Sequence, residues 1–444
     1  MSILSYFTAR SPTTQVFLIA LATRIIHLSI LHLLTRLVPL FDSSPELLQR
    51  SPLPGLRWDA IHFASVASSG YEYEQQVAFQ PGWLGVMRSA GEVVRWVRGA
   101  AVVDIADVVL GGTIVANASI IGATVVLYKL STHIFDPTYA FITCLLYLLP
   151  PTAILGSSYT EPLYALLTFT GIYMLAIKKQ MFISALFFAG ASSIRSTGVF
   201  NALFIFAYYV CGSVDLDDPS DLRLLKGIVL RTAKTMPSNL LVIAPFVAFQ
   251  WYTSVGFCTS EAMSADTARP WCHNDPPFSY SFVQSLYWNV GPFKYWTLAQ
   301  LPNIALALPI LYSSFLGTST FLRSFFRSTI FPNPGRTLPK PARPLPELYL
   351  AHILTMALLL FASHTQIALR VCLGDPVVWW NVVGLAFQWD KREKGGRLEM
   401  TQLGRYWVGW TVVWGSVAMV LWAGHYPPAW SKMHLLPECT MALR

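Results

Sequence analysis

Long apolar segments recur along the chain and limit its possible folds more than any other feature. The first covers residues 16–40, and a membrane helix needs about 20 apolar residues at ~1.5 Å of rise each. It exceeds a signal-peptide core and no small-residue cleavage site follows it, so we expect it to remain as a span. Further spans are predicted at residues 105–128, 138–156, 163–177, 240–257, 298–316, 348–361, 376–387 and 407–423.

These segments predict an all-α polytopic membrane protein, with residues 1–444 forming a single multi-span domain. We expect about eleven transmembrane helices, with the N-terminus cytosolic and the C-terminus on the opposite side. Only 12% of the residues are charged, against about 25% in a soluble domain. The net charge of +8 lies mostly in short loops, as membrane orientation requires, and no basic stripe interleaved with aromatic residues predicts a nucleic-acid partner.

The polar loops are expected on two sides of the membrane. Residues 41–100 and 258–297 form two long loops assigned to the lumen, whereas residues 213–236 and the basic, Pro-rich residues 317–346 are assigned to the cytosol. The acidic residues after position 213 resemble a D-x-D-D metal or nucleotide-sugar motif, but a solvated helix start is the favoured interpretation.

The six cysteines have no C-x-x-C spacing, so neither a zinc site nor a redox pair is predicted. Cys258 and Cys272 fall in the same polar loop, where a disulfide is possible if that loop is luminal.

The stretch P-G-L-R-W-D-A-I-H-F at residues 54–63 places Arg57, Trp58, Asp59 and His62 within six positions. At a membrane edge beside a water-filled cavity, Asp59 could act as a base while Arg57 holds a phosphate. In the alternative interpretation, Trp58 anchors at the lipid interface and Arg57 pairs with Asp59 or with lipid headgroups.

Residues 181–211 are apolar except for S-S-I-R-S-T-G at 192–198. We expect two short helices that meet at this break, with Arg195 directed into a cavity, because an arginine that faces lipid at mid-depth costs several kcal/mol. A single long helix with a buried ion pair is the alternative. On the predicted topology, Arg195 and a polar patch around His364 could line one cavity together with both long loops.

An ordered set of short motifs resembles the PIG-V family of mannosyltransferases. The set extends over nearly the whole chain and comprises R-W-D-A-I-H-F at 57–63, G-Y at 70–71, Y-E at 73–74, A-F at 78–79, P-G at 81–82, S-Y-T-E-P at 158–162, R-S-T-G at 195–198, P-W-C at 270–272, Y-W-N-V-G at 287–291, and H-T-Q at 364–366 with Arg370.

The resemblance implies a GT-C type glycosyltransferase of the endoplasmic reticulum membrane with a luminal active site. Such an enzyme takes mannose from dolichyl phosphate mannose and adds the second mannose, through an α-1,6 linkage, to a mannosylated precursor of the glycosylphosphatidylinositol (GPI) anchor. It needs no metal or other cofactor, and fungal members work with a small accessory membrane subunit. The resemblance assigns Asp59 as the catalytic base, and Glu74 is the second candidate.

Several other side chains are candidates for substrate binding. Arg195, Arg370 and His364 are expected at the donor phosphate, and Trp271, Tyr287 and Trp288 at the sugar or the lipid. A helix-packing role is the alternative for each of these residues, and Glu72 could instead be a solvated turn residue. The complete set of substrate-binding candidates is Arg57, Trp58, His62, Glu72, Arg195, Trp271, Tyr287, Trp288, Asn289, His364, Gln366 and Arg370.

Two other functions fit the composition. A polytopic transporter or lipid flippase would have polar groups along a path through several helices, whereas the polar groups here concentrate in loops on one side, and no internal repeat is visible. The second alternative is a mannosyltransferase that acts on protein or on another lipid-linked sugar. Only the motif resemblance separates that enzyme from one that acts on the GPI precursor.

Overall fold

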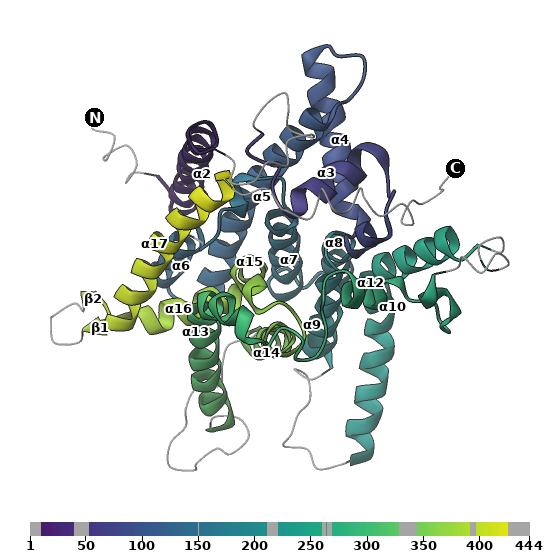
Figure 1. Cartoon of the computed structure of the whole chain (residues 1–444). Coiled ribbons are helices and arrows are strands. Elements are labelled where there is room, and N and C mark those ends of the chain that lie inside the picture. The colour runs from purple at the N-terminus through teal and green to yellow at the C-terminus, as the bar shows by residue number, and fades with distance from the viewer. Residues whose placement is uncertain are drawn as a thin grey trace.

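Helices dominate the computed structural model of the chain (Figure 1). The structure describes residues 10–39, 53–149, 151–210, 221–259, 263, 269–327, 344–390 and 397–424. Within these described ranges, five helices are long and apolar enough to cross a membrane: α2 (Pro12–Leu37), α5 (Ile105–Ile134), α10 (Asp221–Phe257), α13 (Leu301–Phe325) and α17 (Gln402–Gly424). A sixth candidate is the pair Thr365–Gly374 and Pro376–Ala386, which is bent by 96°.

Shorter helices complete the bundle. They are α6 (Pro137–Tyr147), α7 (Thr160–Ala176), α8 (Met181–Ile194), α9 (Phe200–Tyr209), α14 (Leu345–Phe361) and α16 (Pro376–Ala386). The predicted helical multi-span architecture is therefore confirmed, with one small addition. Strands β1 (Phe387–Asp390) and β2 (Arg397–Met400) form an antiparallel pair in which Phe387 lies opposite Met400.

Two helices extend into stretches that were assigned to cytosolic loops. Helix α10 begins at Asp221, inside the loop predicted at 213–236, and α13 continues to Phe325, inside the loop predicted at 317–346. The length of an apolar run indicates how much of a helix can lie within lipid. The helix itself can continue through charged residues such as Lys226, because lysine is a good helix former. The acidic positions before 221 lie outside the described residues.

Small residues let α5 lie in close contact with its neighbours. A side-chain carbon added at Gly111 would lie 2.6 Å from the carbonyl carbon of Ala90 in α4 (Pro81–Arg98). One added at Gly112 would lie 2.9 Å from both Met87 and Ser158. Close approach of helix backbones through small residues is a common way to pack helices within a membrane.

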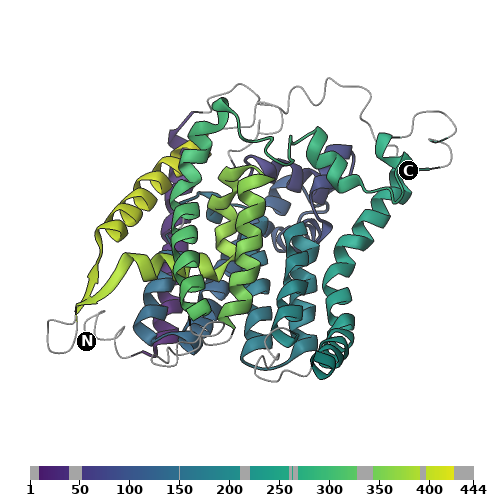
Figure 2. The same ribbon diagram turned by 90° about the horizontal axis from the view of Figure 1, so that it is seen from below.

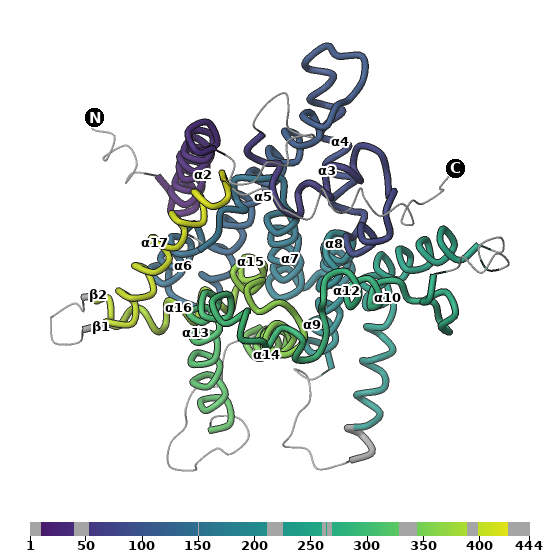
Figure 3. Tube along the Cα trace, viewed as in Figure 1, coloured from purple at the N-terminus to yellow at the C-terminus, as the bar shows by residue number. Residues whose placement is uncertain are grey.

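Helix α17 runs from one end of the bundle to the other (Figures 2 and 3). Helix α17 begins next to the β1–β2 pair and ends next to the first predicted luminal loop, where the carbonyl of Ala423 accepts a hydrogen bond from Arg57. Its 23 residues correspond to about 35 Å of helix.

The two long polar loops contain short helices of their own. The first loop contains α3 (Asp59–Ser69), the 3₁₀ helix η1 (Glu74–Ala78) and α4, and the second contains η5 (Pro270–His273) and α12 (Ser279–Leu286). A disulfide between Cys258 and Cys272 closes the second loop, as the spacing allowed.

Candidate active site

The predicted base, Asp59, is the first residue of α3. Its backbone N–H donates to the Tyr159 hydroxyl at 3.0 Å, and its side chain is 25% exposed. The preceding residue, Trp58, has φ 53° and ψ −132°, a conformation that costs a non-glycine residue free energy and that often occurs at functional sites. The turn therefore holds Asp59 at a helix N-terminus, where a carboxylate is stabilised.

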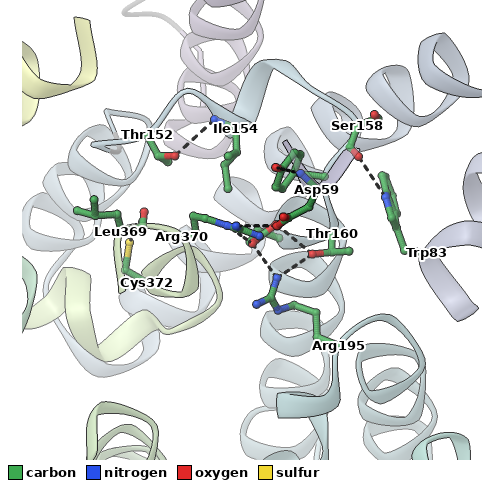
Figure 4. Close-up of polar contacts among 12 residues, drawn as sticks. Asp59, Trp83, Thr152, Ile154, Ser158, Thr160, Arg195, Leu369, Arg370 and Cys372 are labelled. Carbon is green, nitrogen blue, oxygen red and sulfur yellow. Dashed lines mark hydrogen bonds and ion pairs between the residues drawn. The ribbon is translucent and has the colours of Figure 1, made fainter. Parts of the chain in front are cut away.

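Asp59 belongs to a cluster of two arginines and two carboxylates (Figure 4). Arg370 donates from Nη1 to Asp59 Oδ2 and from Nε to Glu161 Oε1, both at 2.9 Å. Arg195 Nη1 donates to the same Glu161 oxygen at 2.7 Å and to Thr160 Oγ1 at 2.8 Å. Glu161 is 2% exposed, whereas the two arginines are 18% and 23% exposed. Glu161 thus anchors both guanidinium groups from the buried side.

Arg195 lies at the predicted break in the helix. Helix α8 ends at Ile194, a 3₁₀ turn η3 (Ser196–Val199) follows, and α9 then begins at Phe200. Gly198 makes the turn possible, because a side-chain carbon there would lie 2.5 Å from the Ser192 backbone. The prediction of two short helices was right, and the ion pair proposed in the alternative is also present.

Arg370 lies on a second interrupted segment. The short elements η8 (Thr365–Ile367), α15 (Ala368–Val371) and η9 (Cys372–Gly374) precede the 96° bend into α16. The guanidinium carbon of Arg370 is 4.9 Å from the centre of the Tyr159 ring, a cation–π distance. Tyr159 therefore contacts both Asp59 and the arginine that pairs with Asp59.

The second candidate base, Glu74, lies in a different environment. Its carboxylate accepts hydrogen bonds from Trp271 Nε1 at 2.7 Å and from the Tyr287 hydroxyl at 2.6 Å, and it is 2% exposed. These contacts join the first loop to the second. Trp271, predicted to contact sugar or lipid, has no exposed surface because it packs in a small core with Val77, Phe249 and Phe257.

Three candidates in the first loop have local structural contacts. Arg57 is 1% exposed and donates to the carbonyls of Leu53, Leu56 and Ala423, so its guanidinium holds backbone together where a phosphate was predicted. Trp58 is 43% exposed. Glu72 is exposed and its backbone N–H donates to Gln76 Oε1, as expected for the alternative of a turn residue.

The remaining candidates are His62 in α3, three residues of the second loop, and His364 and Gln366. His62 is one helical turn from Asp59, and its ring centre is 5.7 Å from that of Trp288. Burial lowers the pKa of His62, although the Asp59 carboxylate acts in the opposite direction. His364 stacks on Tyr295 with ring centres 4.7 Å apart.

One pocket is lined in part by Tyr287, Trp288, Asn289 and His364. Gln366 is half-buried in η8, two residues after His364. The structure therefore places residues of the second loop and His364 around one pocket, whereas neither Arg195 nor a residue of 41–100 is among the residues that line it.

Glu161 and Tyr159 were missed as site residues. Both belong to the S-Y-T-E-P motif at 158–162, which contributed to the family resemblance but was given no role in the site. Glu161 is a carboxylate at the start of an apolar helix, and an ionisable residue in such a place is a signal of function. Among the described residues, no group of three His, Cys, Asp or Glu side chains is arranged to hold a metal ion.

Comparison with known proteins agrees with the motif resemblance. The family described as Mannosyltransferase (PIG-V) matches residues 3–429. GPI mannosyltransferase 2 of Cryptococcus neoformans var. neoformans serotype D (strain B-3501A) is 59% identical, over 94% of this chain and 99% of that protein. GPI alpha-1,6-mannosyltransferase 2 of Rattus norvegicus is 30% identical, over 78% of this chain and 75% of that protein.

Among solved structures, the archaeal oligosaccharyltransferase AglB from Archaeoglobus fulgidus aligns with a TM-score of 0.46 and 13% identity. The alignment covers 93% of this chain and 57% of AglB.

Proposed function

We propose a catalytic arrangement from one premise: this chain belongs to the PIG-V family of mannosyltransferases. It is a GPI mannosyltransferase that adds the second mannose, in α-1,6 linkage, to the GPI precursor. The activity implies dolichyl phosphate mannose as donor and a GPI precursor lipid as acceptor. The reaction therefore needs a base for an acceptor hydroxyl and positive charge for the departing phosphate.

Asp59 is the base in this proposal. The acceptor oxygen forms a bond to C1 of the donor mannose while the bond from C1 to the phosphate oxygen breaks. The hydroxyl proton passes to Asp59, and the electron pair of the broken bond leaves with dolichyl phosphate. The observation that carries the assignment is the 2.9 Å contact between Asp59 and Arg370, because it places a partly exposed carboxylate beside two arginines that Glu161 holds.

Arg370 and Arg195 stabilise the leaving phosphate. Nε and Nη1 of Arg370 are engaged by Glu161 and Asp59, whereas no described carboxylate accepts from its Nη2. Glu161 and Asp59 balance the two guanidinium charges, so the protein itself keeps the arginines in place. Such preorganised charge is effective because no rearrangement is needed as the phosphate develops its charge.

Glu74 has a supporting role in this proposal. Its two oxygens already accept hydrogen bonds from Trp271 and Tyr287, which hold the second loop against the first. We also place the active site on the luminal side of the endoplasmic reticulum membrane, because the disulfide in the second loop fits an oxidising compartment. The GT-C fold type, a total of about eleven transmembrane helices and a small accessory subunit remain predictions.

The test is mannose transfer by membranes that contain Asp59→Asn, supplied with dolichyl phosphate mannose and a one-mannose acceptor. Loss of a general base typically lowers the rate by about 10²–10⁴-fold. The matched control is Asp104→Asn, which also removes a carboxylate paired with an arginine, Arg98, at 3.0 Å, but on the surface. Equal protein amounts with transfer lost only in Asp59→Asn support the assignment. Transfer at the unchanged rate would refute it.

Glu74→Gln separates the two candidate bases. We expect this variant to lose protein stability because it weakens the contacts with Trp271 and Tyr287. Transfer per folded molecule should fall far less than in Asp59→Asn. The reverse order of rates would move the base to Glu74.

A further inference from the structure

A pocket of about 270 Å³ lies between the second loop and His364. It is lined by Tyr287, Trp288, Asn289, Lys294, Tyr295, Thr297, Gln300 and His364. Pockets for drug-sized ligands typically measure about 300–1,000 Å³, so this one suits a single ring better than an extended glycan.

Two residues that line the pocket, Trp288 and His364, connect it to the proposed base, Asp59. The Trp288 ring is 5.7 Å from that of His62, which lies one turn after Asp59 in α3. On the other wall, the His364 ring stacks on Tyr295 with ring centres 4.7 Å apart, and the Asp59 carboxylate acts to raise the pKa of His364. The pocket is therefore connected to the base through the contact of Trp288 with His62.

The lining has the chemistry of a sugar site. Aromatic rings provide flat apolar faces, and Asn289, Thr297 and Gln300 provide hydrogen-bonding groups. Lys294 is the one lysine or arginine among the residues that line the pocket, and none of these residues is a carboxylate. Burial lowers the pKa of His364, which favours its neutral form. This charge balance suits a neutral hexose and disfavours an amino sugar, whose ammonium group would meet Lys294 without a counter-ion.

The pocket is also held in shape without a ligand. The Tyr287 hydroxyl is fixed by Glu74, and Lys294 Nζ donates to Ser285 Oγ at 2.6 Å. Asn289 has φ 49°, a left-handed conformation that asparagine tolerates better than most residues. The backbone N–H of Phe293 donates to the carbonyl of Phe361 at 2.6 Å, which ties the loop to the end of α14. A preformed pocket loses less entropy when a ligand binds.

We infer that this pocket is the acceptor subsite and binds the neutral hexose whose hydroxyl is deprotonated by Asp59. The inference rests on the proposed function and extends it to residues outside the family motifs, chiefly Gln300, Lys294 and Tyr295. The donor mannose and phosphate are then left to the opposite side of Asp59, at the arginine cluster.

Gln300→Leu tests the inference, with Gln402→Leu as its matched control. Gln402 is exposed on α17 and lies at the end of that helix away from Asp59. Removing one hydrogen-bonding amide should raise the acceptor KM about 3- to 10-fold and leave the donor KM within about twofold. Gln402→Leu should change neither. A raised donor KM with an unchanged acceptor KM would overturn the inference, yet the transfer reaction would stand.

A second measurement uses the wild-type enzyme and needs no folded variant. Methyl α-mannoside should inhibit competitively against the acceptor, and methyl glucosaminide should inhibit more weakly because it carries an ammonium group. Competition against the donor alone, or equal inhibition by the amino sugar, would overturn the inference. Binding of the mannoside to Asp59→Asn should persist, so a failed base assignment is distinguishable from a failed acceptor subsite.

Discussion

The change Glu161→Gln tests the centre of the arginine cluster. Glu161 Oε1 accepts from Arg195 at 2.7 Å and from Arg370 at 2.9 Å, and its side chain is 2% exposed. Each charge-assisted hydrogen bond contributes about 1.5–3 kcal/mol, and breaking a buried ion pair typically costs about 3–5 kcal/mol. A glutamine oxygen still accepts a hydrogen bond, so we expect the lower end, about 3 kcal/mol.

Two measurements follow from that value. The free energy of unfolding in detergent should fall by about 3 kcal/mol, and transfer at low donor concentration should fall by about 10²-fold, because 1.4 kcal/mol corresponds to a factor of ten. The donor KM should rise more than the acceptor KM, since the released arginines are those proposed to bind the donor phosphate.

Glu92→Gln is the matched control for this change. Glu92 also pairs with two arginines, Arg88 at 2.9 Å and Arg95 at 2.7 Å, but its side chain is 40% exposed. Exposed pairs contribute little to stability, so this variant should unfold and transfer mannose like the wild type. If Glu161→Gln also behaved like the wild type, the view that Glu161 anchors the arginines would be refuted.

Two further predictions concern packing and pH. Gly82→Ala should reduce the amount of folded protein, because the new carbon would lie 2.3 Å from Ser193 Oγ and 2.5 Å from the Ser193 carbonyl oxygen. The control is Gly85→Ala, whose new carbon would meet nothing within 4 Å. Equal yields of the two folded variants would contradict this prediction. The lowered pKa of His62 means that the unfolded chain binds a proton near pH 6.5 more readily than the folded protein does. The stability contributed by its neutral ring is therefore present above about pH 6.5 and lost as the pH falls below it, so thermal unfolding of His62→Gln should depend less on pH between about 7.5 and 5.5 than that of the wild type.

The fold was predictable where a local pattern determines it. The interruption at 192–198 combines small polar residues with an arginine inside an apolar run, and the break occurs there because an exposed cation within lipid is costly. Helix ends were predicted less well, since α10 and α13 continue beyond their apolar runs. Hydropathy detects the lipid-facing length, whereas a helix ends where its backbone hydrogen bonds find other partners.

Site residues were harder to predict because exposure depends on tertiary packing. Trp271 and Trp288 were both predicted to contact sugar or lipid, yet Trp271 is fully buried against Phe257 and Trp288 lines a pocket. Arg57 is adjacent to the motif aspartate, but its contact with Ala423 joins positions 366 residues apart and no local signal encodes it. The partnership of Asp59 with Arg370, separated by 311 residues, is equally non-local.

The C-terminal end of α17 contacts the residues that precede and surround Asp59. Ala423 accepts from Arg57, Trp422 Nε1 donates to the carbonyl of Pro54 at 3.0 Å, and the Trp422 ring lies 5.4 Å from that of Tyr159. A ribosome makes the chain from its N-terminus at about 5–20 residues per second, so these contacts are among the last to form. The aspartate motif emerges early in synthesis and remains without this support until α17 is inserted. A nascent or truncated chain that lacks α17 thus carries all the proposed catalytic side chains and is still an incomplete enzyme.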